Sequence, residues 1–465
     1  MAVPEPSKAQ HPISILLRGP GVAASLIRGL MGIGSLQMVG ALLRLATGVQ
    51  LARMLGPRQL GFYSLALSIS ALVSVPTEFG LTALVTRETA TACEHQNWGQ
   101  LRGVLSWANR VIAVTAPATM VTAVVVVFAW RGIRPEFVAT LYWALVLVPA
   151  VPIMNTRAAA LLASGRPVLS QIPALILRPG LFALALLATS LVAHGSLLGS
   201  AAMRLQALVT VVAMTVALAL LVFYLPPPVR TVQPQYRSAA WFRATLPMGL
   251  TEGLRVVQGH LAVFLVGLFS TPQAVGLFKV ADSASQLCLL PISIVFVVMA
   301  PSIARFHSAS NSASLQRLLA YSTAAVLAGI LTLSLPLAIG GPRFLAWVFG
   351  HQFGAAYPTL MVLCFGYATA VAMGPATTYM NMTGGEQQVT RALVLGVLAN
   401  ALVAVVAIPR LGSIGAAMGN TTGYFVWVAI LWRAAHKRDN IDTSLIASLR
   451  VVPRDLARLL AGARD

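Results

Sequence analysis

The chain carries about twelve apolar segments, each long enough to cross a lipid bilayer. A spanning helix needs about 20 apolar residues, because each residue rises only about 1.5 Å. The segments lie at 30–55, 61–83, 105–130, 137–156, 168–193, 196–224, 246–270, 274–300, 316–340, 355–379, 388–408 and 411–433. Only 9% of the 465 residues are charged, against about 25% in soluble domains. We therefore expect an all-α, polytopic membrane protein.

The basic residues gather in alternate loops. The formal net charge is +20, from 32 Lys and Arg against 12 Asp and Glu. Twenty of the basic residues fall on the predicted side of the N-terminus, six on the opposite side and six inside spans. The positive-inside rule then places both termini in the cytosol. Because no basic stripe or nucleic-acid-binding motif accompanies the charge, we expect no nucleic-acid partner.

The sequence lacks the common signatures of catalysis. It has no phosphate-binding P-loop, no HExxH, no GxSxG and no loop large enough for a soluble catalytic domain. Cys93, Cys288 and Cys364 show no metal-binding spacing and are interpreted as small apolar residues. We expect a membrane transporter rather than an enzyme, with no metal and no bound cofactor.

One sequence pattern occurs twice, 215 residues apart. Residues 57–66 and 272–281 both read Pro-x-x-x-Gly-x-aromatic-x-x-Ala, and a proline follows each glycine 15 residues later. Six spans precede and six follow the Pro-rich loop at 226–244. These features predict two six-helix lobes related by a parallel repeat about an axis normal to the membrane, around a central cavity.

This reading divides the chain into five parts. They are a cytosolic N-terminal lead-in at 1–28, an N-lobe at 29–225, a cytosolic Pro/Arg linker at 226–244, a C-lobe at 245–434 and a basic cytosolic tail at 435–465. The lead-in lacks the apolar core and the cleavage site of a signal peptide. A basic surface helix around Arg454, or a simply solvated tail, is expected at the C-terminal end.

Charged residues inside the spans are the candidates for binding substrate. Each costs about 2.5–3.5 kcal/mol to insert, so it normally faces a cavity or an ion partner. The carboxylates inside the spans are too few to neutralise the cations, which favours an anionic substrate such as a pyrophosphate. The cationic candidates for the cavity are Arg44, Arg178, Arg204, Arg255 and Lys279, whereas Arg110 and Arg204 could instead snorkel to an interface.

Helical spacing groups several of these residues. Gln37, Gly40, Arg44 and Thr47 share one face of the first span. Two acidic residues lie three positions from a cation, in the pairs Glu252–Arg255 and Lys279–Asp282. These pairs either hold helices together or take part in transport, in which case Glu252 and Asp282 are the candidates for binding a coupling proton or sodium ion.

Two further features have structural interpretations. A lone membrane histidine, His260, is expected to be packed or hydrogen-bonded. The four-residue spacing of Gly415, Gly419 and Gly423 predicts close helix packing in the last span.

Four motifs resemble those of one known family. They are the hinge at 52–66, the loop Phe349–Tyr357, the turn Met382–Glu386 and the stretch Ile408–Ala417, which is similar to an "IPxxGxxGAA" turn. Their order and spacing, over about residues 30 to 434, resemble the Wzx-type polysaccharide flippases of the MOP transporter superfamily.

The resemblance implies a substrate and a location. Members flip undecaprenyl-pyrophosphate-linked oligosaccharides, for O-antigen, capsule or exopolysaccharide, from the cytoplasmic to the periplasmic leaflet of the bacterial inner membrane. It implies alternating access with a cationic cavity for the headgroup, and coupling to an ion gradient. The expected partners are this lipid-linked oligosaccharide, membrane lipids, and the polymerase and assembly proteins of the pathway.

Three other functions stay open. A cation-coupled exporter of small molecules in the same superfamily usually has an acidic cavity, which this basic interior does not favour. A membrane polymerase or ligase typically needs a large outward loop. A non-transporting scaffold leaves the costly intramembrane arginines unexplained.

Overall fold

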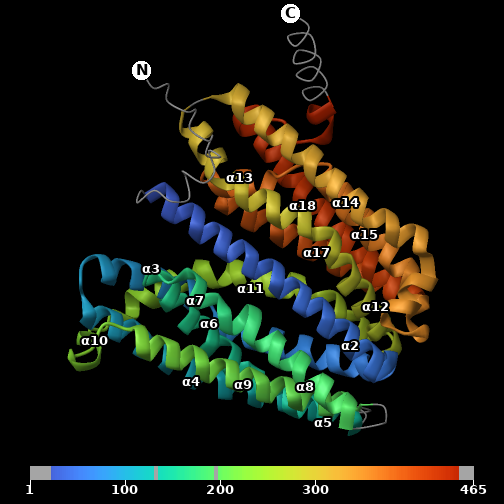
Figure 1. The fold of residues 1–465 in the computed structure, drawn as a ribbon, viewed down its shortest axis with the longest axis horizontal. Coiled ribbons are helices and arrows are strands. Elements are labelled where there is room, and N and C mark those ends of the chain that lie inside the picture. Colours follow the sequence, from blue (N-terminus) through green and yellow to red (C-terminus); the bar gives the residue numbers. More distant parts are fainter. Residues whose placement is uncertain (1–21, 130–134, 193–196, 310, 450–465) are drawn as a thin grey trace, which may run out of the picture.

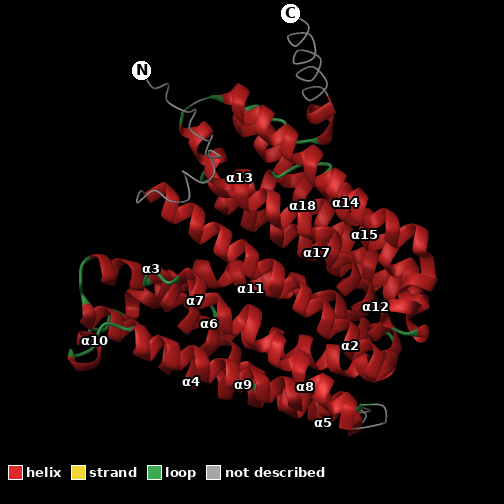
Figure 2. Ribbon diagram, in the orientation of Figure 1, coloured by secondary structure: helices red, strands yellow, loops and turns green. Residues whose placement is uncertain are grey.

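The computed structural model describes residues 22–129, 135–192, 197–309 and 311–449. Within these ranges the chain is nearly all helical and contains no strand, which confirms the all-α prediction (Figure 2). The first 21 residues of the expected lead-in lie outside the described residues, as does the expected surface helix around Arg454.

The N-terminal half forms one bundle. Its elements are α2 (Val22–Glu78), α3 (Leu81–Glu94), α4 (Trp98–Ala129), α5 (Pro135–Leu145), α6 (Leu147–Ala163), α7 (Pro167–Ile172), the π-helical turn η1 (Pro173–Leu177), α8 (Arg178–Val192) and α9 (Gly199–Tyr224). A short helix, α10 (Pro228–Thr231), lies in the linker that follows.

The C-terminal half forms a second bundle beside the first. Its elements are α11 (Ser238–Phe269), α12 (Pro272–Ser285), the 3₁₀ turn η2 (Gln286–Leu289), α13 (Leu290–Ser308), α14 (Ser312–Phe349), the 3₁₀ turn η3 (His351–Ala356), α15 (Tyr357–Val371), α16 (Ala376–Met382), α17 (Glu386–Leu411) and α18 (Ser413–Asp439). Figure 1 shows α4, α6, α8 and α9 together on one side, α14, α15, α17 and α18 on the other, and α2 and α11 between them.

Eleven helices of the described chain are long and apolar enough to cross a membrane. The first of them covers 34–78, which at 1.5 Å per residue is about twice the thickness of a bilayer core. Gly56 breaks it into two arms, since its φ of 68° and ψ of 174° are accessible essentially to glycine alone. Two arms of about 33 Å each bring the number of crossings to about twelve, as the sequence predicts.

The two ends of the bundle are called the hinge end and the linker end. The hinge end contains Gly56, Pro272, Gly350 and Gly412, and the linker end contains Gly80, the linker at 226–237, Asn311 and Asp439. The helices run alternately between the two ends, and long-range bonds agree with this. At the hinge end, Arg53 of α2 donates to the carbonyl oxygens of Trp347 (2.7 Å) and Val348 (2.8 Å) in α14.

The two copies of the repeated motif pack against each other at the hinge end. A Cβ on Gly61 would lie 1.8 Å from the Pro272 carbonyl oxygen, and a Cβ on Gly276 would lie 2.0 Å from that of Pro57. The contact is reciprocal. Gly61 meets Pro272, and their counterparts in the repeat, Gly276 and Pro57, meet in the same way. Such a contact is the mark of a two-fold axis, here an approximate one. The predicted internal repeat is therefore present in three dimensions.

The repeat extends to the segment after the sixth span of each lobe. In the N-lobe, the linker folds back on α4, where the Gln235 amide donates to the Gly99 carbonyl (2.9 Å). In the C-lobe, Thr443 follows α18, and its carbonyl accepts a bond from Thr323 of α14 (3.1 Å). Each lobe therefore covers its own linker end.

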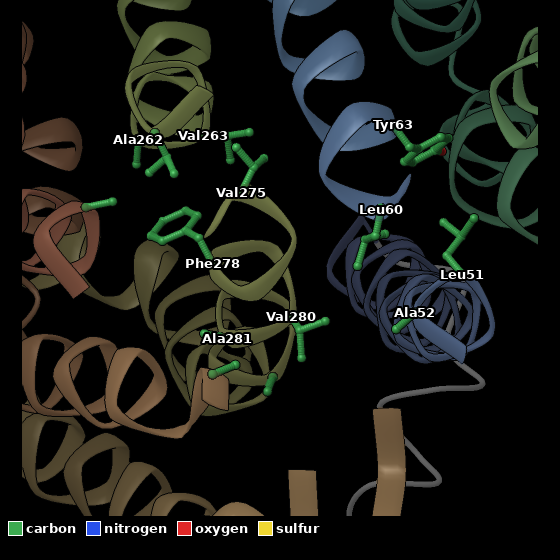
Figure 3. Close-up of a cluster of buried hydrophobic side chains, with 14 of the residues drawn as sticks. Leu51, Ala52, Leu60, Tyr63, Ala262, Val263, Val275, Phe278, Val280 and Ala281 are labelled. Carbon is green, nitrogen blue, oxygen red and sulfur yellow. The ribbon is translucent and has the colours of Figure 1, made fainter. Parts of the chain in front are cut away.

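The described buried apolar side chains form a large cluster shared by both lobes and smaller clusters that belong mainly to one lobe. The shared cluster lies toward the hinge end and joins residues of α2, α11 and α12, such as Leu60, Val263 and Phe278 (Figure 3). Toward the linker end, Leu84 belongs to an N-lobe cluster that also takes in Trp241 of α11, and Ile303 belongs to a distinct C-lobe cluster. The lobes thus share a broad apolar contact at the hinge end, whereas toward the linker end they meet through the start of α11.

The glycine stripe of the last span packs as predicted. A Cβ on Gly415 would meet the Ala407 backbone at 2.5 Å, and Cβ atoms on Gly419 and Gly423 would meet Asn400 at 2.9 and 2.7 Å. The small residues let α18 lie directly on α17.

The boundary of the tenth predicted span differs from the structure. It was expected at 355–379, but α15 ends at Val371 and a turn at Gly374 separates it from α16. Gly374 has a φ of 78°, and a Cβ there would lie 1.7 Å from the Thr443 carbonyl oxygen. The segment around Thr443, which returns after α18, therefore requires the break between α15 and α16. Gly374 and Thr443 are 69 residues apart in the sequence.

Candidate functional site

Arg44 lies on the first arm of α2, where that arm crosses a distorted part of the fifth span. Its neighbour Gly40 is buried, and a Cβ on it would lie 2.9 Å from the Leu175 carbonyl oxygen and 3.5 Å from Nη1 of Arg44. The glycine allows close contact between the two backbones, and Arg44 lies one turn further along the same face. Its side chain is exposed rather than packed.

The distortion opposite Arg44 has an identifiable cause. Pro179 has no N–H, so it cannot donate to the carbonyl of Leu175 four residues earlier. The helix widens there into the π-helical turn η1, and the Arg178 amide donates to Pro173, five residues back. Such π-helical turns are found frequently at functional sites. The Leu175 carbonyl, which receives no bond from Pro179, is the one that faces Gly40.

Arg178 begins α8 directly after this wide turn. Its charge acts on both Arg44 and the phenol of Tyr63 on the second arm of α2. Tyr63 is itself buried and stacks on Phe182 with ring centroids 6.4 Å apart. No ion pair of the described residues includes Arg44 or Arg178. Two guanidinium groups therefore lie near each other without a carboxylate to neutralise them.

Arg255 lies at a similar depth in the other lobe. Counted along the helices, Arg44, Arg178 and Arg255 are each about 18–21 Å from the hinge end, well inside a bilayer core about 30 Å thick. Arg255 Nε is 3.9 Å from Glu252, and the two side chains are 51% and 58% exposed. This contact is at the limit of an ion pair and leaves Arg255 available to another anion.

Lys279 and Asp282 form the tighter pair predicted from their spacing. Lys279 Nζ lies 2.8 Å from Asp282, whose side chain is only 16% exposed. The carboxylate also acts electrostatically on the phenols of Tyr367 and Tyr424. Asp282 thus neutralises Lys279 within a polar cluster of the C-lobe.

The remaining candidates lie apart. Arg204 is exposed near the start of α9, about 8 Å from Gly199, which contacts Gln59 at the hinge end. Arg110 stacks on Tyr236 of the linker at 4.8 Å, which fits an interfacial role. His260 is hydrogen-bonded, as expected: its Nδ1 lies 3.2 Å from the Ser68 hydroxyl of the other lobe.

The sequence reading missed two buried polar groups near the linker end. Arg157 follows the end of the predicted span at 137–156, in the expected loop, but the structure places it within α6, only 5% exposed, where it donates to Asn109 and to Thr156 (2.9 Å). The indole of Trp241 donates to Glu88 (3.1 Å) and so ties the start of α11 to the N-lobe. Neither contact has a local sequence signal, because the partners are 48 and 153 residues apart.

Glu88, in the short helix α3 outside the candidate spans, is the centre of this linker-end network. Burial acts to raise the pKa of its carboxyl, but bonds from Arg87, Gln100 and Trp241 outweigh it and lower the pKa below its usual value. The Gln100 amide donates at 2.8 Å and Arg87 at 2.9 Å. A charged Glu88 therefore holds α3, α4 and α11 together.

Comparison with solved structures identifies the fold. A MATE-family multidrug resistance transporter of the MOP superfamily, in an inward-facing conformation, matches with a TM-score of 0.70 at 16% identity over 86% of this chain and 94% of its own. The lipid II flippase MurJ, in an inward closed conformation, matches at 0.64 and 11% identity over 93% of each chain. A MOP-superfamily transporter from Pyrococcus furiosus matches at 0.62 and 17% identity, over 93% of this chain and 99% of its own.

Sequence comparison identifies the family. No curated protein matches this chain. A family model described as "Polysaccharide biosynthesis protein" matches residues 26–307, more than half of the chain and including both copies of the repeated motif. The chain is thus a multi-pass membrane protein with the fold of MOP-superfamily transporters, and it belongs to the polysaccharide biosynthesis protein family.

Proposed function

We propose that this protein flips an undecaprenyl-pyrophosphate-linked oligosaccharide from the cytoplasmic to the periplasmic leaflet by alternating access. The observation that carries the proposal is the pair Arg44–Arg178, two cations close enough to act on each other electrostatically, on helices that touch at Gly40 and Leu175, without a carboxylate partner among the described residues. Such a pair is costly unless an anion fills the space between them. The family membership supports a substrate from polysaccharide synthesis.

A pyrophosphate matches this arrangement chemically. The planar guanidinium fork donates two parallel bonds to phosphate oxygens, which a single ammonium group does not. Arg255, loosely held at a similar depth in the other lobe, supplies a third donor. An anion bound between lobes would thereby link Arg44 and Arg178 of the N-lobe to Arg255 of the C-lobe.

Alternating access is supported by the unequal ends of the bundle. The shared apolar cluster, the reciprocal Pro–Gly contact and the Arg53 bonds join the lobes at the hinge end. At the linker end the cluster around Ile303 contains no described N-lobe residue, and the N-lobe cluster takes in the start of α11 from the C-lobe.

The charge distribution supports placing the linker end in the cytosol. The linker end of the described chain carries basic residues such as Arg102, Arg230 and Arg391, and the hinge end has fewer. The substrate headgroup would then enter between lobes that are open to the cytosol. The bacterial inner membrane, and contact with the polymerase and assembly proteins of the pathway, belong to the same proposal.

For ion coupling we favour Asp282 over Glu252. Asp282 is mostly buried, is bonded to Lys279 and acts electrostatically on Tyr367, so an ion bound at its carboxylate would alter a polar cluster of the C-lobe. Glu252 is more than half exposed, and its contact with Arg255 is long.

The charge of the site argues against export of cationic drugs. Arg44 and Arg178 would repel a cation, whereas a drug-proton exchanger of that kind needs carboxylates. For the MOP-superfamily transporter from Pyrococcus furiosus, the reverse polarity of the binding pocket is said to suggest a different function. The same reasoning from charge applies to this chain.

The proposal is tested by transport in proteoliposomes with a labelled undecaprenyl-pyrophosphate-linked oligosaccharide. Arg44→Ala and Arg178→Ala each remove a charge-assisted bond worth about 1.5–3 kcal/mol. We expect transport efficiency to fall about 10- to 150-fold for each. The control is Arg204→Ala, which removes an exposed arginine near the hinge end and should transport like the wild type.

Two results would contradict the proposal. One is unchanged transport in both Arg44→Ala and Arg178→Ala while the protein stays folded. The other is an equal loss in Arg204→Ala, which would show that total charge, rather than this pair, is what matters.

A further inference from the structure

A second basic site lies on the C-lobe, between α17 and α18 at the linker end. A cavity of about 480 Å³ opens there. Arg391, Lys437 and Arg438 form its basic rim, and Leu395, Ile430 and Ala434 form its apolar floor. Gln388 completes the lining. The site is on different helices from Arg44 and Arg178, so the proposed substrate site does not explain it.

The helices create this cavity by their packing. Residues 388, 391 and 395 share one face of α17, and residues 430, 434 and 437 share one face of α18. Small residues hold the two helices in contact from Gly415 as far as Gly423, where Gly396 also contacts Trp427. Nearer the linker end the side chains are larger, and they leave a groove with basic residues at its mouth.

The rim carries an excess of positive charge. Arg438 pairs with Asp439 at 2.8 Å and also donates to Thr383. No ion pair found among residues 22–449, gaps excepted, includes Arg391 or Lys437, and both are exposed. Two cations of the rim are therefore available for an anion.

The floor indicates what the anion is attached to. Leu395 is 49% exposed, and further along α17 Leu398 and Leu402 are 58% and 70% exposed. Exposed leucines at this spacing continue from the groove along the span, on a face suited to acyl chains. The other face of α17 is occupied, because Thr390 contacts Thr251 of α11 at 3.2 Å. A ligand here would have a phosphate at one end and hydrocarbon at the other.

We propose that the groove formed by Gln388, Arg391, Leu395, Ile430, Ala434, Lys437 and Arg438 binds an anionic phospholipid. Its phosphate lies between Arg391 and Lys437, and its acyl chains follow Leu395 toward the hinge end. Basic pockets between membrane helices commonly bind lipid headgroups in this way. The site takes a resident lipid of the surrounding leaflet, and it is independent of the transported substrate.

The test uses two exposed glutamines at the linker end. Gln388→Glu puts a carboxylate one turn from Arg391, where it can pair with that cation and repel a phosphate. Gln96→Glu adds the same charge on the N-lobe, at a position that does not line the groove. Binding of dioleoylphosphatidylglycerol and of dioleoylphosphatidylcholine to the full-length protein in detergent is measured by native mass spectrometry.

We expect the wild type to prefer phosphatidylglycerol, Gln388→Glu to bind it about three- to tenfold more weakly, and Gln96→Glu to match the wild type. A double variant, Arg391→Gln with Lys437→Gln, should lose the preference, whereas Arg305→Gln with Arg433→Gln removes the same charge at the same end and should keep it. Equal effects within either pair, or no preference in the wild type, would overturn the proposal. Displacement of the lipid by millimolar inorganic phosphate would overturn the assignment to a lipid.

Discussion

The reciprocal contact at the hinge end predicts how a single methyl group shifts the balance between conformations. In Gly276→Ala the new Cβ would lie 2.0 Å from the Pro57 carbonyl oxygen, whereas carbon and oxygen normally approach no closer than about 3.3 Å. The lobes must separate by about 1.3 Å at this point, or strain must be stored in both backbones. Overpacking of this kind costs about 1–3 kcal/mol.

The cost falls on the conformation that is closed at the hinge end. A conformation in which the lobes have parted there does not contain the contact, so it is not destabilised. The substitution therefore shifts the equilibrium toward hinge-end opening by about 5- to 150-fold. The Gly61→Ala variant, with its Cβ 1.8 Å from Pro272, should act in the same direction.

The shift can be read as a distance between spin labels at the hinge end. Labels at Leu191 of α8 and Arg343 of α14 report on the N-lobe and the C-lobe, in a background without the three native cysteines. Double electron–electron resonance should show a longer-distance population that grows in Gly276→Ala. The matched control is Gly259→Ala, since no atom lies within 4 Å of a Cβ at that position.

An unchanged distance distribution in a folded Gly276→Ala protein would refute this reasoning. It would mean that the closed state accommodates the methyl group by local adjustment. A shift of the same size in Gly259→Ala would also refute it, because helix propensity rather than the lobe contact would then be responsible.

Two further predictions concern carboxylates. The lowered pKa of Glu88 means that its stabilising effect is present above the pKa of an unfolded glutamate, about 4.3, and is lost as the pH falls through the folded value below it. Thermal unfolding should thus show Glu88→Gln less stable than the wild type at pH 7, with a gap that shrinks below about pH 4, and a gap independent of pH would contradict the assignment. Asp282→Asn leaves Lys279 without its partner, so we expect about 1 kcal/mol of lost stability and transport that no longer responds to a proton or sodium gradient; retained coupling in proteoliposomes would exclude Asp282 as the coupling residue.

Features that depend on a short stretch of sequence were predictable. The break at Gly56, the glycine stripe on α18 and the pairing of Lys279 with Asp282 follow from spacing along one helix, and the structure contains all three. The internal repeat could also be predicted from the sequence, because a contact related by two-fold symmetry requires similar residues in both copies of the motif.

Features that depend on contacts between distant segments were not predictable. The sequence showed Pro179 near Arg178, but only the fold places the resulting π-helical turn against Gly40 and so brings Arg178 near Arg44. Arg157 looked like a loop residue because its hydrogen-bond acceptor, Asn109, is on another helix. Charge alone could not separate Arg204 from the paired arginines, since their difference lies in depth and neighbours.

The reciprocal Pro–Gly contact has a consequence for how the two halves can differ. In a homodimer of a six-helix chain, one gene would encode both contacts, and a change at the glycine would alter both at once. In the fused chain each half varies alone, and the halves have in fact diverged in charge: α2 carries an unneutralised Arg44, whereas α12 carries Lys279 with its own carboxylate. A symmetric joint can thus connect two lobes with different arrangements of charge, which we propose serve to hold an anion in one lobe and to bind a coupling ion in the other.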